Sequence, residues 1–150
     1  MNPGNDLSRE LEVARAAARE AAALVVSFAG RPLDVQHKTG GEPVSKADLA
    51  SSELIVRRLA EAFPEDAILS EELPDDASRL TKSRVWMIDP IDGTSDFLRG
   101  ENGFVVMIGL CQEGRPSVGA LAQPTTGEVW LGVGGGGAWK ERADGSRLTC

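Results

Sequence analysis

Cysteine, histidine and aromatic residues are scarce in this chain of 150 residues, in which aromatic residues make up 5%. The two cysteines, Cys111 and Cys150, have no partners at metal-ligand spacing, which argues against a cysteine-ligated metal site. Cys111 lies in an apolar strand pattern, so a buried, reduced thiol is favoured, and this indicates a cytoplasmic location. The single histidine, His37, is interpreted as a strand residue rather than a catalytic group.

Positive charge is also in short supply, because 16 lysines and arginines stand against 23 acidic residues, which gives a formal net charge of −7. This balance argues against binding to a nucleic acid polymer or an anionic membrane, since lysine and arginine supply most of that affinity. It is compatible with a small anionic substrate, because bound divalent cations reverse the local charge.

Long hydrophobic runs and a basic leader are absent as well. The longest apolar stretch, residues 104–111, is far too short to cross a bilayer, which needs about 20 residues. Residues 1–6 lack the basic start of a secretory signal. We therefore expect no membrane span and a cytoplasmic protein.

Two amphipathic helices are predicted within one compact domain. In residues 7–28 the apolar residues repeat at helical spacing, and Gly30 follows as a stop signal. A second helix begins at Ser45, where Asp48 three residues later is typical of an N-terminal cap, and it ends near Pro64. The predicted apolar face of this second helix consists of Leu49, Leu54, Ile55 and Leu59.

Short strand-like runs follow the second helix, and one more is predicted at residues 34–38. A polar surface loop spans residues 74–83. The glycine-rich residues 132–137 have the spacing of a dinucleotide-binding loop, but no apolar helix follows, so they are interpreted as a strand connection. The main runs are residues 67–69, 85–88, 105–110, 117–121 and 128–133. Together the elements predict an α+β fold with two helices packed on one face of an antiparallel sheet.

The stretch Asp-Pro-Ile-Asp-Gly-Thr at residues 89–94 directly follows one of these runs. Asp89 and Asp92 would face opposite sides of a straight strand, but the proline and glycine between and after them favour a turn that lets both reach one hard cation. Glu71 ends another apolar run and can bring a third carboxylate to the same place. The alternative is an Asp-Pro turn in which Asp92 caps a helix start at residues 93–95. The position of Glu71 favours the metal site.

Residues 70–72, Ser-Glu-Glu, followed by Trp-Met-Ile-Asp-Pro-Ile-Asp-Gly-Thr at 86–94, resemble the inositol monophosphatase superfamily of lithium-sensitive, magnesium-dependent phosphatases. The resemblance runs from the first helix to the last residues and implies the amino-terminal half of a layered sugar-phosphatase fold. It also implies that magnesium ions are bound by Glu71, Asp89, Asp92 and the backbone carbonyl of Ile91.

The same resemblance implies roles in catalysis and substrate binding. Glu71 and Thr94 would orient the attacking water, and Asp48 would hydrogen-bond to Thr94 while also capping its own helix. The amides of Gly93 and Thr94, with Ser95 beside them, would hold the substrate phosphate at a helix start. The expected activity is that of a phosphoric monoester hydrolase.

Within the superfamily, residues 69–72 and 137–141 look most like the 3′(2′),5′-bisphosphate nucleotidase branch, whose members remove the 3′-phosphate of adenosine 3′,5′-bisphosphate. Residues 95–97, Ser-Asp-Phe, depart from the patterns of this branch and of the inositol monophosphatases. An inositol phosphate is therefore the alternative substrate, and a small phosphorylated molecule is expected in either case.

Members of the resembled family are substantially longer, and their second half supplies another metal-binding aspartate in a Trp-Asp motif. Nothing after Asp92 resembles that motif. We therefore expect residues 1–150 to be an amino-terminal metal-binding domain, with a carboxy-terminal substrate domain absent and a companion half or a homo-oligomer as candidate partner. The alternative is a catalytically incomplete module that binds divalent ions and needs a partner chain.

Overall fold

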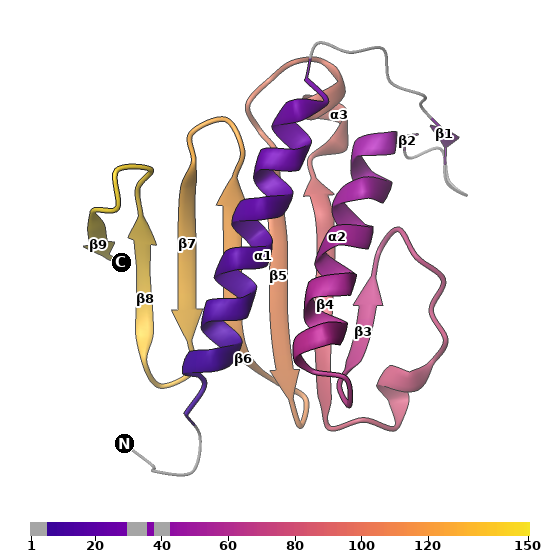
Figure 1. The fold of residues 1–150 in the computed structure, drawn as a ribbon, viewed down its shortest axis with the longest axis vertical. Helices are drawn as coiled ribbons and strands as arrows, with labels where there is room; N and C mark the ends of the chain where they lie inside the picture. The colour runs from indigo at the N-terminus through magenta and orange to yellow at the C-terminus, as the bar shows by residue number, and fades with distance from the viewer. Residues whose placement is uncertain (1–5, 30–35, 38–42) are drawn as a thin grey trace.

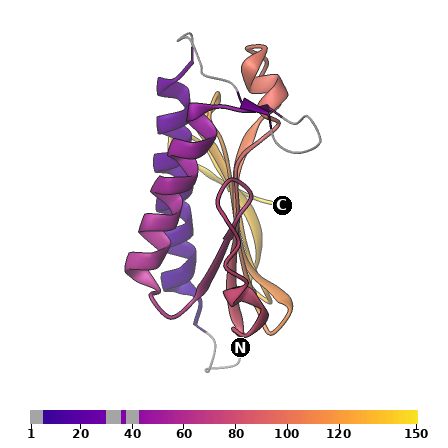
Figure 2. The same cartoon turned by 90° about the vertical axis from the view of Figure 1, so that its right-hand side faces the viewer.

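The computed structural model describes residues 6–29, 36–37 and 43–150. Two long helices, α1 (Ser8–Ser27) and α2 (Lys46–Ala62), lie side by side over one face of a seven-stranded sheet (Figure 1). Figure 2 shows the molecule from the side, with these helices in one layer and the sheet in another. In spatial order the strands are β3 (Ala67–Ser70), β4 (Arg84–Asp92), β5 (Val105–Gln112), β6 (Arg115–Gln123), β7 (Glu128–Val133), β8 (Gly137–Glu141) and β9 (Arg147–Thr149).

The remaining elements are short. β1 (Gln36–His37) pairs antiparallel with β2 (Pro43–Val44) directly before α2, and α3 (Thr94–Leu98) follows β4. A 3-10 turn (Ser78–Leu80) lies in the loop between β3 and β4. The strand predicted at 34–38 is present at the two residues of β1, whereas its other positions and the stop signal at Gly30 lie outside the described residues.

The α+β fold class predicted from the sequence is confirmed. The sheet is mixed rather than wholly antiparallel, because β3 and β4 run parallel, with Ser70 opposite Ile88. The connection formed by residues 71–83 returns the chain to the starting end of β3, as a parallel pair requires. The other neighbouring strands pair antiparallel. As a result, β3 and β4 end at the same edge of the sheet.

The glycine-rich residues 132–137 comprise the end of β7, the connection at 134–136 and the first residue of β8, so a strand rather than a helix follows the connection. Their interpretation as a strand connection is confirmed. β8 itself was not predicted, because its sequence, Gly-Ala-Trp-Lys-Glu, has only a weak alternation of apolar and polar residues.

The buried face of α2 differs from its predicted apolar face. Ile55 and Leu59 are fully buried as expected, but Leu49 and Leu54 are only half-buried. The predicted face also missed two serines, Ser51 and Ser52, which have no exposed surface. Small hydroxyl side chains allow α2 to approach the strands closely, and both serines find hydrogen-bond partners there.

Two further predictions concern membrane-spanning helices and the burial of Cys111. None of the described helices is long and apolar enough to span a membrane. Cys111 is free but only half-buried, so the prediction of a buried thiol was wrong about its burial. Its place near the end of β5 leaves it at the margin of the core.

Trp86 of β4 lies at the centre of the core and is fully buried. Its ring stacks on Phe63 with centroids 5.3 Å apart, and its Nε1 donates to Asp66 Oδ2 at 2.9 Å. The other oxygen of Asp66 accepts from Arg84, which also pairs with Glu10 of α1. These contacts fasten the start of β4 to the end of α2 and the start of α1.

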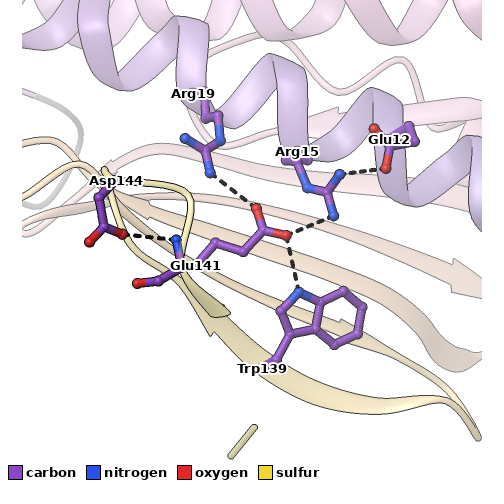
Figure 3. Close-up of polar contacts among 7 residues, drawn as sticks. Glu12, Arg15, Arg19, Trp139, Glu141 and Asp144 are labelled. Atoms are coloured by element: carbon purple, nitrogen blue, oxygen red, sulfur yellow. Dashed lines mark hydrogen bonds and ion pairs between the residues drawn. The ribbon is translucent and has the colours of Figure 1, made fainter. Parts of the chain in front are cut away.

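A second polar cluster holds α1 over the opposite edge of the sheet (Figure 3). Glu141 of β8 accepts hydrogen bonds from Arg15 at 2.9 Å, from Arg19 at 3.0 Å and from Trp139 Nε1 at 3.2 Å. Burial opposes ionisation of Glu141, but the hydrogen bonds from Trp139 and Arg19 and the charge of Arg15 hold its pKa below the ordinary value. The negative charge at this edge is therefore neutralised within the chain.

We expect Glu141→Gln to lower the free energy of unfolding by about 1–3 kcal/mol at pH 7, because Arg15 and Arg19 lose their shared counter-charge. The matched control Glu12→Gln removes the exposed partner of the same Arg15 and should cost less than about 1 kcal/mol. Urea unfolding followed by tryptophan fluorescence measures both changes, and equal effects would contradict this account.

The same measurement repeated against pH gives a second readout. A carboxyl group whose pKa is lower in the folded state stabilises the fold fully above its unfolded pKa of about 4.3. For Glu141 this contribution should disappear as the pH falls through the lowered pKa. The Glu141→Gln variant should lack that part of the acid sensitivity.

Candidate metal and phosphate site

Glu71 and Asp89 are brought together by the parallel pairing of β3 and β4. Ser70 ends β3 opposite Ile88, and the amide of the next residue, Glu71, donates to the carbonyl oxygen of Ile88 at 3.2 Å. Asp89 follows Ile88 directly in β4. The two carboxylate-bearing residues therefore lie next to each other at one edge of the sheet.

Asp92 is placed by a β-bulge at the end of β4. Asp89 pairs with Met107 and Asp92 pairs with Val105, so β4 carries one more residue than β5 over this interval. Such an extra residue bends the strand and increases its twist. Pro90, within the bulge, has no amide hydrogen to give to the strand ladder, and bulges tolerate this. The bulge takes the place of the simple turn expected from the sequence.

Negative charge is concentrated around Asp89. Burial, the charge of Glu71 and a hydrogen bond with the Glu71 side chain raise the pKa of Asp89 to about 7. The charges of Asp92 and Glu72 act in the same direction. Asp89 Oδ1 is also buried without a hydrogen-bond partner among the described residues. A cation at this oxygen would relieve both the repulsion and the missing contact.

Asp48 connects the start of α2 to the start of α3. Its Oδ2 accepts from the amide of Ser45 at 2.8 Å and from the Ser45 hydroxyl at 2.6 Å, and its own amide donates back to that hydroxyl. Its Oδ1 accepts from Thr94 Oγ1 at 2.9 Å. Fully buried Asp48 thus caps α2 and contacts Thr94 at the same time.

Thr94 has two acceptors within reach, Asp48 Oδ1 and the carbonyl oxygen of Ile91 at 3.0 Å. A hydroxyl group has one proton to donate. When that proton goes to Asp48, the Ile91 carbonyl keeps its lone pairs, and the Thr94 oxygen can still accept a hydrogen bond from water. The Ile91 carbonyl oxygen can therefore contact a cation, and Thr94 Oγ1 can contact water. These are the roles that the resemblance implies for the two residues.

The predicted phosphate-binding residues open α3. Gly93 is the N-cap, Thr94 is the first helical residue, and Ser95 is exposed. No side-chain hydrogen bond caps this helix, so the alternative in which Asp92 caps it is not observed. Gly93 has a φ of +90°, and a Cβ there would lie 2.3 Å from the carbonyl oxygen of Gly103. Only glycine fits this position.

The donor set suits magnesium, which prefers carboxylate and carbonyl oxygens and retains several waters. Within residues 6–29, 36–37 and 43–150, no three acidic, histidine or cysteine side chains already form a metal-binding group. Magnesium that also contacts a phosphate needs only one or two protein carboxylates, a number that Glu71 and Asp89 match. The roles of Glu71, Asp89, Asp92 and Ile91 as ligands remain a prediction.

A cavity of about 740 Å³ adjoins Glu71 and Asp89 along the sheet. Met87 is 47% exposed beside it, although Trp86 and Ile88 on either side are buried. Sequence reasoning missed this apolar surface, although the nearly continuous apolar runs of β4 and β5 are typical of strands with two covered faces. Apolar residues lining the cavity include Leu69, Leu73, Met87, Met107 and Leu121.

The chain is similar to proteins of known sequence or structure. The chain is 37% identical over 134 residues to a Streptomyces griseus protein named glucose-1-phosphate thymidylyltransferase, covering 89% of this chain and 51% of the relative. It is 36% identical over 112 residues to the 3′(2′),5′-bisphosphate nucleotidase CysQ of Escherichia coli (strain K12), covering 74% of this chain and 45% of the relative. The crystal structure of extragenic suppressor protein suhB from Bartonella henselae matches with a TM-score of 0.81 and 29% identity, over 87% of this chain and 51% of that one.

These matches define the class, a family of phosphatases. The sequence pattern of the inositol monophosphatase family matches residues 6–148, and the chain belongs to this family. The chain spans about half the length of the curated relatives it matches. Because the names of the relatives describe different reactions, family membership leaves the substrate open.

We expect Gly93→Ala to destabilise the chain strongly, because the added Cβ meets the Gly103 carbonyl in addition to the cost of a positive φ. Gly100→Ala is the matched control, since Gly100 has a φ of +73° but no atom within 4 Å of its Cβ position. The control should lose about 1–2 kcal/mol of unfolding free energy, and Gly93→Ala clearly more. Similar losses in urea unfolding would show that the close approach of residues 93 and 103 is not rigid.

Proposed function

We propose that this chain is the metal-binding part of a magnesium-dependent phosphomonoesterase. The observation that carries the proposal is Asp89, a half-buried carboxylate with an unpartnered buried oxygen, placed beside Glu71 and Asp92. Glu71 and Asp92 are exposed, but holding their charges beside a half-buried carboxylate without a counter-ion is unfavourable, so such an arrangement is typical of a site that functions with a cation bound.

In the proposed site, Glu71, Asp89, Asp92 and the carbonyl of Ile91 hold the magnesium. When bound, magnesium neutralises charge on the phosphate and makes water a better nucleophile. Two conditions on the chain follow. The carboxylates must turn toward a common point, and the Ile91 carbonyl must be released by Thr94, whose proton then goes to Asp48.

The remaining residues act on water and phosphate. Thr94, with its proton committed to Asp48, accepts a hydrogen bond from the attacking water, and Glu71 accepts a second one. The amides of Gly93 and Thr94, with Ser95 beside them, hold the phosphate where α3 begins, because no side chain of the helix start competes for them. Asp48 positions Thr94 and, being fully buried and held by Ser45, does so rigidly.

The proposed substrate is adenosine 3′,5′-bisphosphate, from which the 3′-phosphate is removed. The likeness to the nucleotidase CysQ and the resemblance of residues 69–72 and 137–141 to that branch support this choice. An inositol monophosphate is the alternative, because the family as a whole is described by that activity.

The chain is further proposed to act together with a companion region, either a carboxy-terminal substrate domain or a second chain. Its relatives are about twice as long. The exposed apolar side chains on the uncovered sheet face, Met87 among them, suit a surface that another layer covers.

Metal binding is tested with Asp89→Asn in chelator and in magnesium at pH 7.5. In chelator the variant should be more stable than the natural chain, because one of the crowded charges is removed. Magnesium at 100 times its dissociation constant should stabilise the natural chain by about 2.7 kcal/mol and the variant hardly at all. Asp144→Asn, an exposed turn position far along the chain, should behave as the natural chain does.

The activity is tested by phosphate release from adenosine 3′,5′-bisphosphate and from inositol 1-phosphate, each with magnesium and with excess chelator. We expect release that requires magnesium, is faster from the nucleotide and is abolished by Asp89→Asn. Preference for inositol 1-phosphate would favour the alternative substrate. Magnesium binding without release from either would show that this chain alone is an incomplete site, and absence of magnesium binding would contradict the proposal.

A further inference from the structure

The first two turns of α2 contact all three segments that carry the proposed site. Asp48 bonds to Thr94 at the start of α3. One turn later, Ser51 Oγ donates to the carbonyl oxygen of Pro90 at 3.1 Å, and Ser52 Oγ hydrogen-bonds to Ser70 Oγ. Both serines are fully buried, at positions where an amphipathic helix would ordinarily carry apolar residues.

The contact of Ser51 lies within the bulge that separates the two aspartates. Pro90 stands between Asp89 and Asp92, where the register between β4 and β5 shifts and the regular ladder is interrupted. A buried carbonyl in such a place needs a donor from elsewhere, and Ser51 supplies it. The hydrogen bond therefore fixes the bulge relative to α2.

The contact of Ser52 lies at the end of the neighbouring strand. Its partner, Ser70, is also buried and directly precedes Glu71. Ser70 Oγ also accepts from the amide of Glu72 at 3.4 Å, so the same hydroxyl holds the turn that carries Glu71. Through adjacent residues, α2 thus holds both strand ends from which the carboxylates project.

We infer that Ser51 and Ser52 are positioning residues that set the distance between Glu71 and the aspartates of the bulge, and thereby the affinity of the site for a divalent cation. The inference rests on the proposed function, because it requires that these carboxylates bind a cation. Residues that orient metal ligands from outside typically change metal affinity by about 10- to 100-fold when they are replaced.

A purely structural role for the two serines makes a different prediction. Hydroxyl groups that only satisfy each other can be removed in pairs with little effect, because no unpaired polar group is left behind. Ser52→Ala combined with Ser70→Ala removes both hydroxyl groups of such a pair, together with the long 3.4 Å contact that Ser70 Oγ accepts from the Glu72 amide. If Ser52 serves packing alone, this double variant should recover both the stability and the metal affinity lost in Ser52→Ala. If Ser52 positions Glu71, stability should recover while affinity stays low.

The test measures Mn²⁺ binding by isothermal titration calorimetry and, separately, urea unfolding in chelator. We expect Ser51→Ala, Ser52→Ala and the double variant to bind Mn²⁺ about 10-fold or more weakly than the natural chain. Ile55→Val is the matched control, since this fully buried residue lies one turn further along the same helix. It should lower stability and leave Mn²⁺ affinity within about twofold.

The outcomes distinguish failure of the positioning role of Ser51 and Ser52 from failure of the proposed metal site. Unchanged Mn²⁺ affinity in both single serine variants, or recovery of affinity in the double variant, would overturn the inference and leave the metal site standing. Loss of affinity in Ile55→Val equal to that in the serine variants would also overturn it, because general loosening of α2 would then suffice. Failure of the natural chain to bind Mn²⁺ would contradict the proposed function itself, and the inference with it.

Discussion

Repulsion between like charges at the ends of β3 and β4 is the constraint on which the rest of the site depends. Burial of Asp89, together with the charges of Glu71 and Asp92, raises the pKa of Asp89 to about 7, and one oxygen of Asp89 is buried without a partner among the described residues. A chain gains nothing in stability from this arrangement. It persists because the surrounding backbone is fixed by parallel pairing, by a bulge and by hydrogen bonds from α2.

At the opposite edge of the sheet, the negative charge of Glu141 in β8 is balanced by partners within the chain. There Glu141 meets Arg15, Arg19 and the indole of Trp139, and its pKa is lowered rather than raised (Figure 3). Charges at that edge are balanced within the chain. The contrast between the two edges is the reason for proposing that a bound cation balances the carboxylates near Asp89.

Much of this arrangement follows from local sequence signals. The capping box of Ser45 and Asp48 has a fixed spacing, and the strand ends at Glu71 and Asp89 follow apolar runs, so each could be predicted from neighbouring residues alone. The parallel direction of β3 could not, because it depends on the path of the loop at residues 71–83. Burial of Ser51 and Ser52 was missed for a related reason. Their partners, Pro90 and Ser70, are distant in sequence, and hydrophobic periodicity treats serine as a surface residue.

The central claim is that a divalent cation completes the charge balance at Asp89. Anomalous X-ray scattering from crystals of the chain grown with Mn²⁺ tests this claim most directly, because it locates the metal without reference to activity or stability. The account predicts a peak about 2.0–2.3 Å from the carboxylate oxygens of Glu71 and Asp89 and from the carbonyl oxygen of Ile91. A peak at another place, or none at full Mn²⁺ concentration with these carboxylates still crowded together, would contradict it.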